Sequence, residues 1–402
     1  MHRHLSITLL AAALLAGPAT ILADTWAKTI AAALAKTDPT ARPQALRSMG
    51  SAIRGQADSL VADDPALRLK HQGDQLTSDT GYYEWEAMVD LPLWLPGQRA
   101  ARRALAQTLG LRADALERYL QWEIAGRVRE AAWAAALAQG RVHHAEHRLE
   151  DTQALERNVA RRVAAGELAQ LDLLLAQQET LTAEVDLQSA RAELDAARHR
   201  FSLLTDRNDL PTPLEEQVAP VVELVVDHPG LAAAEATVAQ TRAERDRVGT
   251  ERRANPTLSL GGKRTRDSRY SDPDTSLSVE LSIPFGLGSQ AAPRMAEAEL
   301  AYTEQLTERQ RLQRELDTEI KLAETGIGAA RAALSVAQRQ QALAAKALAL
   351  IERGFELGEI DLAELLRERT KAQEAALNLE VRRLELGQAA SLLNQALGVV
   401  PQ

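Results

Sequence analysis

The chain has 402 residues, of which 26% are charged and only 3% aromatic, and it contains no cysteine. Its wealth of Ala, Leu, Glu, Arg and Gln is typical of long helices rather than of a wide globular core. The formal net charge is −9, and no basic patch stands out, which argues against a nucleic-acid partner. The lack of cysteine excludes a disulfide framework, thiolate chemistry and a lipid attached to a cysteine.

Residues 1–23 have the pattern of a secretory signal peptide. Arg3 precedes the apolar run Leu5–Leu15, and small residues precede Asp24. This run of 11 residues is too short for a spanning helix, which needs ~20 apolar residues, and no later segment reaches that length. We therefore predict an exported, non-lipidated protein that can hold a membrane only through β-strands.

A hairpin of strands is predicted at about 66–94. From Tyr83 to Leu91 an apolar residue stands at every second position, which predicts a strand with one apolar and one polar face. A weaker strand pattern precedes it at Leu67–Gln75. Strands of about 10 residues cross a bilayer when they are tilted. Aromatic residues near the turn resemble an interfacial girdle: Tyr82, Tyr83 and Trp85.

A helical hairpin follows at about 99–206. The stretch 97–210 contains no proline, and only the corner RRVAAGELAQLDLLL at 161–175 interrupts the helical pattern. Gly166 stands where a helix C-terminus needs a left-handed residue, and Glu167 suits the positive start of the next helix. A helix of some 65 residues is a rod of about 100 Å. Such a hairpin must bury its apolar stripe against neighbouring rods, as in a coiled coil.

The rod contains the sequence RVHHAEHRLE, in which His143 and His147 share one helix face. This spacing can hold zinc, but two histidines with no third ligand make a weak site, so a hydrated helix face is the preferred interpretation. No nucleophile–base pair and no phosphate-binding glycine loop appears. We expect no cofactor and no enzyme activity.

The second half of the chain repeats the first at an offset of 192 residues. The stretch ERGFELGEIDLAELL at 352–366 aligns with the first corner without a gap and places Gly358 over Gly166. Two copies of one unit are therefore predicted. The expected parts are a first repeat at 24–210, a proline-rich linker at 211–228 and a second repeat at 229–402, with a strand hairpin at about 257–286 and a helical hairpin at about 294–398.

The strands also predict an oligomer. Four strands cannot close a barrel, because the smallest membrane barrels need about eight, and unsatisfied strand edges are not tolerated in lipid. The hairpins must therefore be shared between chains. The expected fold class is mainly α with a β-barrel part, built as a two-fold internal repeat with long coiled-coil helical hairpins and four transmembrane strands per protomer.

These features resemble the TolC family of outer-membrane efflux factors. The doubled corner, the terminal LLNQALG and the strand pattern of the second half carry the resemblance, which covers nearly the whole mature chain. It implies a homotrimer in the outer membrane of a Gram-negative cell, with a twelve-stranded barrel in the lipid and a tunnel of helical hairpins in the periplasm. It also implies two further partners, a periplasmic adaptor (membrane fusion protein) and an inner-membrane pump.

The resemblance makes the two corners the periplasmic tips of the tunnel. It implies adaptor contacts at Gly166, Glu167, Leu168, Gly358, Glu359 and Ile360. Alternatively, Leu168 and Ile360 simply pack the two helices of each corner together. Carboxylates repeated around an axis favour cations and can gate a pore, although acids at a helix start often only satisfy its dipole. The candidate gate acids are Asp172, Asp361 and Glu364.

The resemblance implies a passive exit duct of a tripartite efflux pump. The stretch LPLWLPGQR at 91–99 and the compact chain resemble members that serve heavy-metal pumps of the cobalt–zinc–cadmium type. Ducts for drugs and organic compounds, or for type I protein secretion, are the alternatives within the family. Two alternatives lie outside the family. One is a soluble periplasmic coiled-coil adaptor, which usually has one helical hairpin. The other is an exported structural coiled coil with no transport role.

Overall fold

The computed structural model describes residues 19–219, 227–286 and 291–401, with side chains from residue 26 onward. The apolar run Leu5–Leu15, assigned to a signal peptide, lies outside these residues. Within the described residues, no helix combines the length and apolar character that a membrane span requires. The chain divides into two compact units. The first unit comprises 1–39, 120–228 and 314–402, and the second comprises 40–119 and 229–313.

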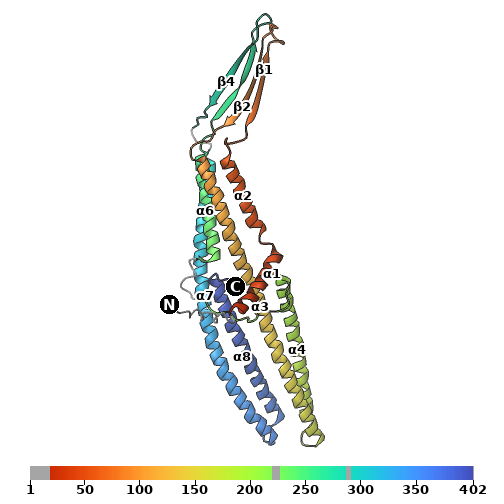
Figure 1. Ribbon diagram of the computed structural model, residues 1–402. Coiled ribbons are helices and arrows are strands. Elements are labelled where there is room, and N and C mark those ends of the chain that lie inside the picture. The colour runs from red at the N-terminus through yellow and green to blue at the C-terminus, as the bar shows by residue number, and fades with distance from the viewer. Residues whose placement is uncertain (1–18, 220–226, 287–290, 402) are drawn as a thin grey trace, which may run out of the picture. The chain divides into compact units, whose positions relative to one another are not determined.

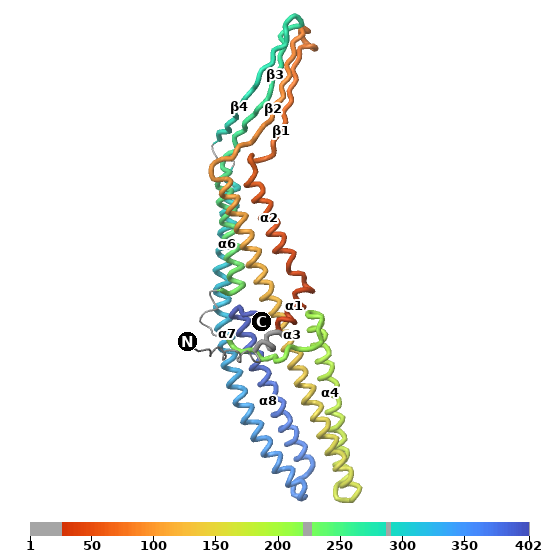
Figure 2. The backbone as a smooth tube through the Cα atoms, in the orientation of Figure 1, coloured from red at the N-terminus to blue at the C-terminus, as the bar shows by residue number. Residues whose placement is uncertain are grey.

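The first unit is a layer of long helices. Its members are α1 (Ala19–Thr37), α4 (Gln170–Thr205), α8 (Leu362–Ala396) and the larger parts of α3 (Gln98–Ala164) and α7 (Ala292–Glu356). The long helices lie in the order α7, α8, α3, α4 (Figure 1). These helices form two long hairpins, α3 with α4 and α7 with α8, and both turn at the same end of this unit (Figure 2).

Small residues allow the helices of the layer to approach closely. Alanines alternate with Leu187 and Leu194 between α3 and α4. Trp133 of α3 is fully buried against Gly387 of α8, where an added Cβ would lie only 2.3 Å from the indole ring. The two hairpins therefore meet along α3 and α8, and any side chain at Gly387 would displace Trp133.

The second unit holds a four-stranded antiparallel sheet with helices that continue its strands. The strands are β1 (Ala66–Gly73), β2 (Tyr83–Pro92), β3 (Thr257–Arg266) and β4 (Asp274–Ser282), in the order β1-β2-β3-β4. Its helices are α2 (Ala41–Asp58), α6 (Pro229–Thr250) and the starts of α3 and α7. β1 and β2 form one hairpin, β3 and β4 form another, and the two hairpins share one sheet.

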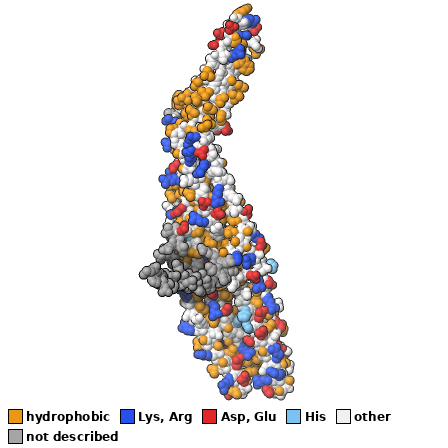
Figure 3. Space-filling view, in the orientation of Figure 1, with side chains coloured by type: hydrophobic (Ala, Val, Ile, Leu, Met, Phe, Trp, Pro, Cys, Tyr) orange, Lys and Arg blue, Asp and Glu red, His pale blue; other side chains and the backbone are white. Residues whose placement is uncertain are grey.

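The register of the sheet separates apolar from polar side chains. Leu67, Val89, Leu260 and Val279 are neighbours across the strands, and all are exposed. Figure 3 shows hydrophobic side chains gathered over the sheet. The other face carries ion pairs, in which the Glu84 carboxylate lies 2.6 Å from the Lys263 ammonium. The face with Leu67 also carries His71, Arg264 and Arg266 toward the hairpin turns, so it is the other half of this face that presents only apolar side chains.

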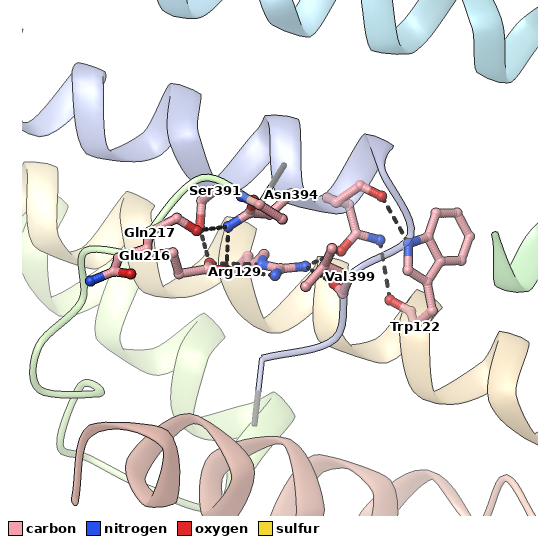
Figure 4. A network of polar contacts seen from close by, with 9 residues as sticks. Trp122, Arg129, Glu216, Gln217, Ser391, Asn394 and Val399 are labelled. Atoms are coloured by element: carbon pink, nitrogen blue, oxygen red, sulfur yellow. Dashed lines mark hydrogen bonds and ion pairs between the residues drawn. The ribbon is translucent and has the colours of Figure 1, made fainter. Parts of the chain in front are cut away.

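A buried polar network ties the linker to the helical layer of the first unit (Figure 4). The Arg129 guanidinium on α3 donates to both carboxylate oxygens of Glu216, at 2.8 and 2.6 Å. Their side chains are 3% and 8% exposed. From α8, the Ser391 hydroxyl and the Asn394 amide also donate to Glu216. The linker carboxylate is thus surrounded by donors from both hairpins.

The same network fixes the end of the chain. Arg129 also donates to the carbonyl of Val399 at 3.0 Å and to the side chain of Gln395. Gln395 and Trp122 exchange two hydrogen bonds, of 2.9 and 3.1 Å. The donors and acceptors of this network satisfy one another, which offsets the free-energy cost of burying the two charges.

Replacing Arg129 with alanine is expected to leave Glu216 buried without its cation, at a cost of about 3–5 kcal/mol in the free energy of unfolding. Denaturant unfolding of the purified protein in detergent measures the loss. Arg127→Ala is the matched control, because Arg127 pairs with Glu123 on the exposed side of the same helix and should cost under about 1 kcal/mol. Equal losses for the two variants would contradict the role assigned to Arg129.

Candidate functional site at the two helical corners

Both corners of the first unit turn through the same backbone structure. Gly166 and Gly358 have φ of +76° and +77°, in the left-handed region. In the first corner the N–H of Glu167 donates to the carbonyl of Arg162 at 2.9 Å, and in the second the N–H of Glu359 donates to that of Gly354 at 2.9 Å. These bonds define a Schellman motif, which explains why glycine is required at both corners.

The helices that leave the corners begin differently. The Asp361 carboxylate accepts the N–H of Glu364 at 2.8 Å, as an N-cap does. Ala169 holds the matching position in the first corner and has no side-chain acceptor, so the Asp172 carboxylate instead accepts the N–H of Ala169 at 3.0 Å. Two of the three candidate gate acids are therefore engaged in capping. The third, Glu364, is exposed and makes no hydrogen bond or ion pair through its carboxylate within the described residues.

The two corners share one apolar cluster, whose buried members are Leu155, Val159, Ala176, Phe355, Leu362 and Leu365. The Arg162 guanidinium lies 4.9 Å from the centre of the Phe355 ring and 3.1 Å from the Glu167 carboxylate. Leu168 is half-buried against this cluster. Ile360 covers Gly354, and a Cβ added to Gly354 would lie 2.7 Å from the Cδ1 atom of Ile360. The structure thus places Leu168 and Ile360 in helix packing, the alternative interpretation of these two residues, while Glu167 and Glu359 are exposed.

Apart from Leu203, Val218 and Leu392, the exposed large hydrophobic side chains in the described part of the first unit form two stripes, one on each outer helix. On α4 they form the α4 edge stripe: Leu171, Leu174, Leu181 and Val185. On α7 and the residue directly after it they form the α7 edge stripe, spaced in multiples of seven residues: Leu322, Val336, Leu343, Leu350 and Leu357. In the described part of this unit, α3 exposes no large hydrophobic side chain and α8 exposes only Leu392. Sequence reasoning missed these stripes, although a spacing of seven is a signal of helix pairing.

The aromatic residues proposed as a girdle divide between the two faces of the sheet. Trp85 is 54% exposed on the apolar face and stacks on His71 with ring centroids 4.1 Å apart. Tyr83 shares that face by alternation and lies under the Arg266 guanidinium. The Tyr82 hydroxyl donates to Glu84 at 3.1 Å, so Tyr82 joins the polar face.

The turn between β1 and β2 is held by one carboxylate. Asp74 accepts the backbone N–H of Thr80 at 2.7 Å and also the hydroxyls of Thr80 and Ser78. The hydrogen bond from the Thr80 hydroxyl is the main reason that the pKa of Asp74 falls to about 2. The turn therefore keeps its charge and its shape at any physiological pH.

His143 and His147 are exposed neighbours on α3. Across the described residues, no group of three or more His, Cys, Asp or Glu side chains is arranged to hold a metal ion.

Known proteins share the fold of this chain. No family model matches it, and no curated protein matches it. The solved structure of the outer-membrane channel OprN is 20% identical, with a TM-score of 0.70 over 93% of this chain and 90% of that one. The solved structure of CusC, a protein that forms a transmembrane channel, is 16% identical, with a TM-score of 0.74 over 96% of this chain and 95% of that one.

The Campylobacter jejuni CmeC outer membrane channel is 12% identical, with a TM-score of 0.72 over 98% of this chain and 94% of that one. At such identities the likeness concerns the fold. The chain therefore has the fold of these outer-membrane channels, mainly helical with a small antiparallel sheet, which is the fold that the resemblance to the TolC family implies.

Proposed function

We propose that three copies of this chain form an outer-membrane channel, the exit duct of a tripartite efflux pump. The observation that carries the proposal is the exposure of apolar surface at both edges of the helical layer and on one face of the sheet. A monomer in water would leave these surfaces unburied, whereas copies that join edge to edge, with their sheets in lipid, would cover all of them.

The two edge stripes differ in sequence and lie on different helices, so the contact between copies is heterologous. The α4 edge stripe of one copy would meet the α7 edge stripe of the next, and such contacts close into a ring when the rotation allows. Each leucine buried there contributes about 1.5–3 kcal/mol. The resemblance sets the number of copies at three.

The sheet supports the same arrangement. β1 and β4 are its two edges, and their unpaired backbone groups would be costly in lipid. Pairing each edge with that of a neighbouring copy would close the sheet into a barrel. Its exposed apolar face would then contact lipid, and the ion pairs of the other face would line the lumen. A soluble adaptor or a structural coiled coil has no use for such a sheet.

Cysteines placed in the two edge stripes are expected to cross-link neighbouring copies, because the native chain has no cysteine to interfere. Two double variants test this contact, Leu174→Cys with Leu350→Cys and Leu181→Cys with Leu343→Cys. In each variant the two positions lie equally far along the helix from their corners, because a helix rises 1.5 Å per residue. Oxidation in membranes followed by non-reducing electrophoresis should give a ladder that ends at the trimer.

Leu174→Cys with Leu322→Cys is the matched control, since Leu322 lies far from the corner on the same stripe. A ladder from the control pair as strong as from the test pairs, or monomers from every pair, would count against the ring.

We also propose that Glu364 gates the duct, because the other two candidate acids cap helices. Replacing Glu364 with alanine should raise the single-channel conductance in a planar bilayer and weaken the preference for cations, since a ring of three carboxylates would be removed. Asp172→Asn serves as the comparison variant. Unchanged conductance for Glu364→Ala would remove Glu364 from the gate.

The partners follow from the same proposal. The exposed corner residues around Glu167 and Glu359 would meet a periplasmic adaptor, and the adaptor would join the duct to an inner-membrane pump. The resemblance of LPLWLPGQR favours heavy-metal cations as the cargo, while drugs and secreted polypeptides are the alternatives.

A susceptibility panel on a deletion strain separates these cargoes. We expect sensitivity to zinc, cadmium or cobalt, restored by the intact gene, with no change toward detergents, dyes and antibiotics. Sensitivity to organic compounds alone would overturn the metal assignment and leave the duct in place. A change only in the exported proteins would indicate polypeptide secretion.

A further inference from the structure

We propose that α3 carries a binding site for a divalent transition-metal cation, formed by the side chains of His143 and His147. The proposal rests on the geometry of this pair and does not depend on the cargo of the duct.

The two imidazoles lie close enough to share one ion, and their Nε2 atoms are within hydrogen-bond distance of each other. Their Nε2 atoms lie 3.2 Å apart, and the ring centroids are 4.5 Å apart with an angle of 85° between the planes. Two nitrogens that bind one ion at about 2.0–2.1 Å each are separated by roughly 2.9–3.4 Å in tetrahedral or octahedral geometry. Both side chains are exposed, so small rotations about Cβ–Cγ can aim their lone pairs at a common point.

A nearby carboxylate favours a cation at this place. The Glu150 carboxylate lies 3.8 Å from Nδ1 of His147, where it favours the tautomer that carries its proton on Nδ1 and leaves Nε2 free to bind metal. Glu146 stands on the same face, but its charge is already paired with Arg191 at 2.9 Å, so Glu150 is the carboxylate that favours a cation here. Two protein ligands leave the remaining positions to water, so the ion would be exchangeable rather than structural.

Helix packing does not account for the pair. His144 lies half-buried in a different groove beside Arg148, and burial is the main cause that lowers its pKa. At the offset of 192 residues, the second repeat has Ser335 and Arg339 in place of the two histidines. If the packing of the long helices required these histidines, both copies would carry them.

The donor set defines the class of ion. Imidazole nitrogen suits zinc, copper, nickel and cobalt, whereas magnesium and calcium prefer oxygen. Among the divalent ions, copper should bind more tightly than zinc.

Calorimetric titration of the purified full chain in detergent tests the site, with a purification tag that contains no histidine. We expect one Cu²⁺ or Zn²⁺ ion per chain and no binding of Mg²⁺. His143→Ala or His147→Ala should weaken binding by at least about tenfold, since even the loss of an outer-shell partner costs that much. His144→Ala and His199→Ala, which remove other histidines of the same unit, should leave the affinity unchanged.

The spectrum of bound Cu²⁺ gives a second readout, because electron paramagnetic resonance reports the imidazole nitrogens directly. The double variant His143→Ala/His147→Ala should lose that signature while keeping the unfolding temperature of the metal-free protein, since both side chains are exposed. Retention of wild-type affinity by the double variant, an equal loss in His199→Ala, or equal binding of Mg²⁺ would each overturn the proposal.

Discussion

The buried ion pair between Arg129 and Glu216 is the interaction on which the first unit depends. Removing both charges from water costs free energy, and only a complete set of hydrogen-bond partners offsets this cost. Those partners come from α3, from α8 and from the linker. The part of the linker around Glu216 is therefore held in one position between the two helical hairpins. A buried pair of this kind selects one arrangement more than it adds net stability.

The two repeats keep what their backbone requires and differ where their surroundings differ. Gly166 and Gly358 have nearly the same φ because the same hydrogen bonds end both helices. Beyond the corners, Leu171 and Leu181 of α4 correspond to Ala363 and Gln373 of α8. α8 lies between α7 and α3, whereas α4 lies at the edge of the layer and meets α1 only near Phe201 (Figure 1). The two corners thus share their backbone structure, while the exposed side chains differ with the position of each helix in the layer.

Much of the fold could be predicted from the sequence, because its signals are local. The alternation from Tyr83 to Leu91 and the proline-free stretches identified the strands and the helical hairpins. The Arg129–Glu216 pair could not be found, because its members stand 87 residues apart among many other arginines and glutamates. The edge stripes were hidden because apolar residues occur on several sides of each rod. Leu168 and Ile360 appeared exposed because a corner in the sequence does not reveal the second corner that packs beside it.

The open edges of the helical layer also bear on how such a protein reaches its final state. If copies join edge to edge as proposed, a newly made copy would present its leucine stripes to water until it met another copy, and the encounter would depend on concentration. At low synthesis rates a single copy would wait longer with these surfaces uncovered, available to proteases and holding chaperones. The abundance of finished rings would then rise more steeply than the rate of synthesis.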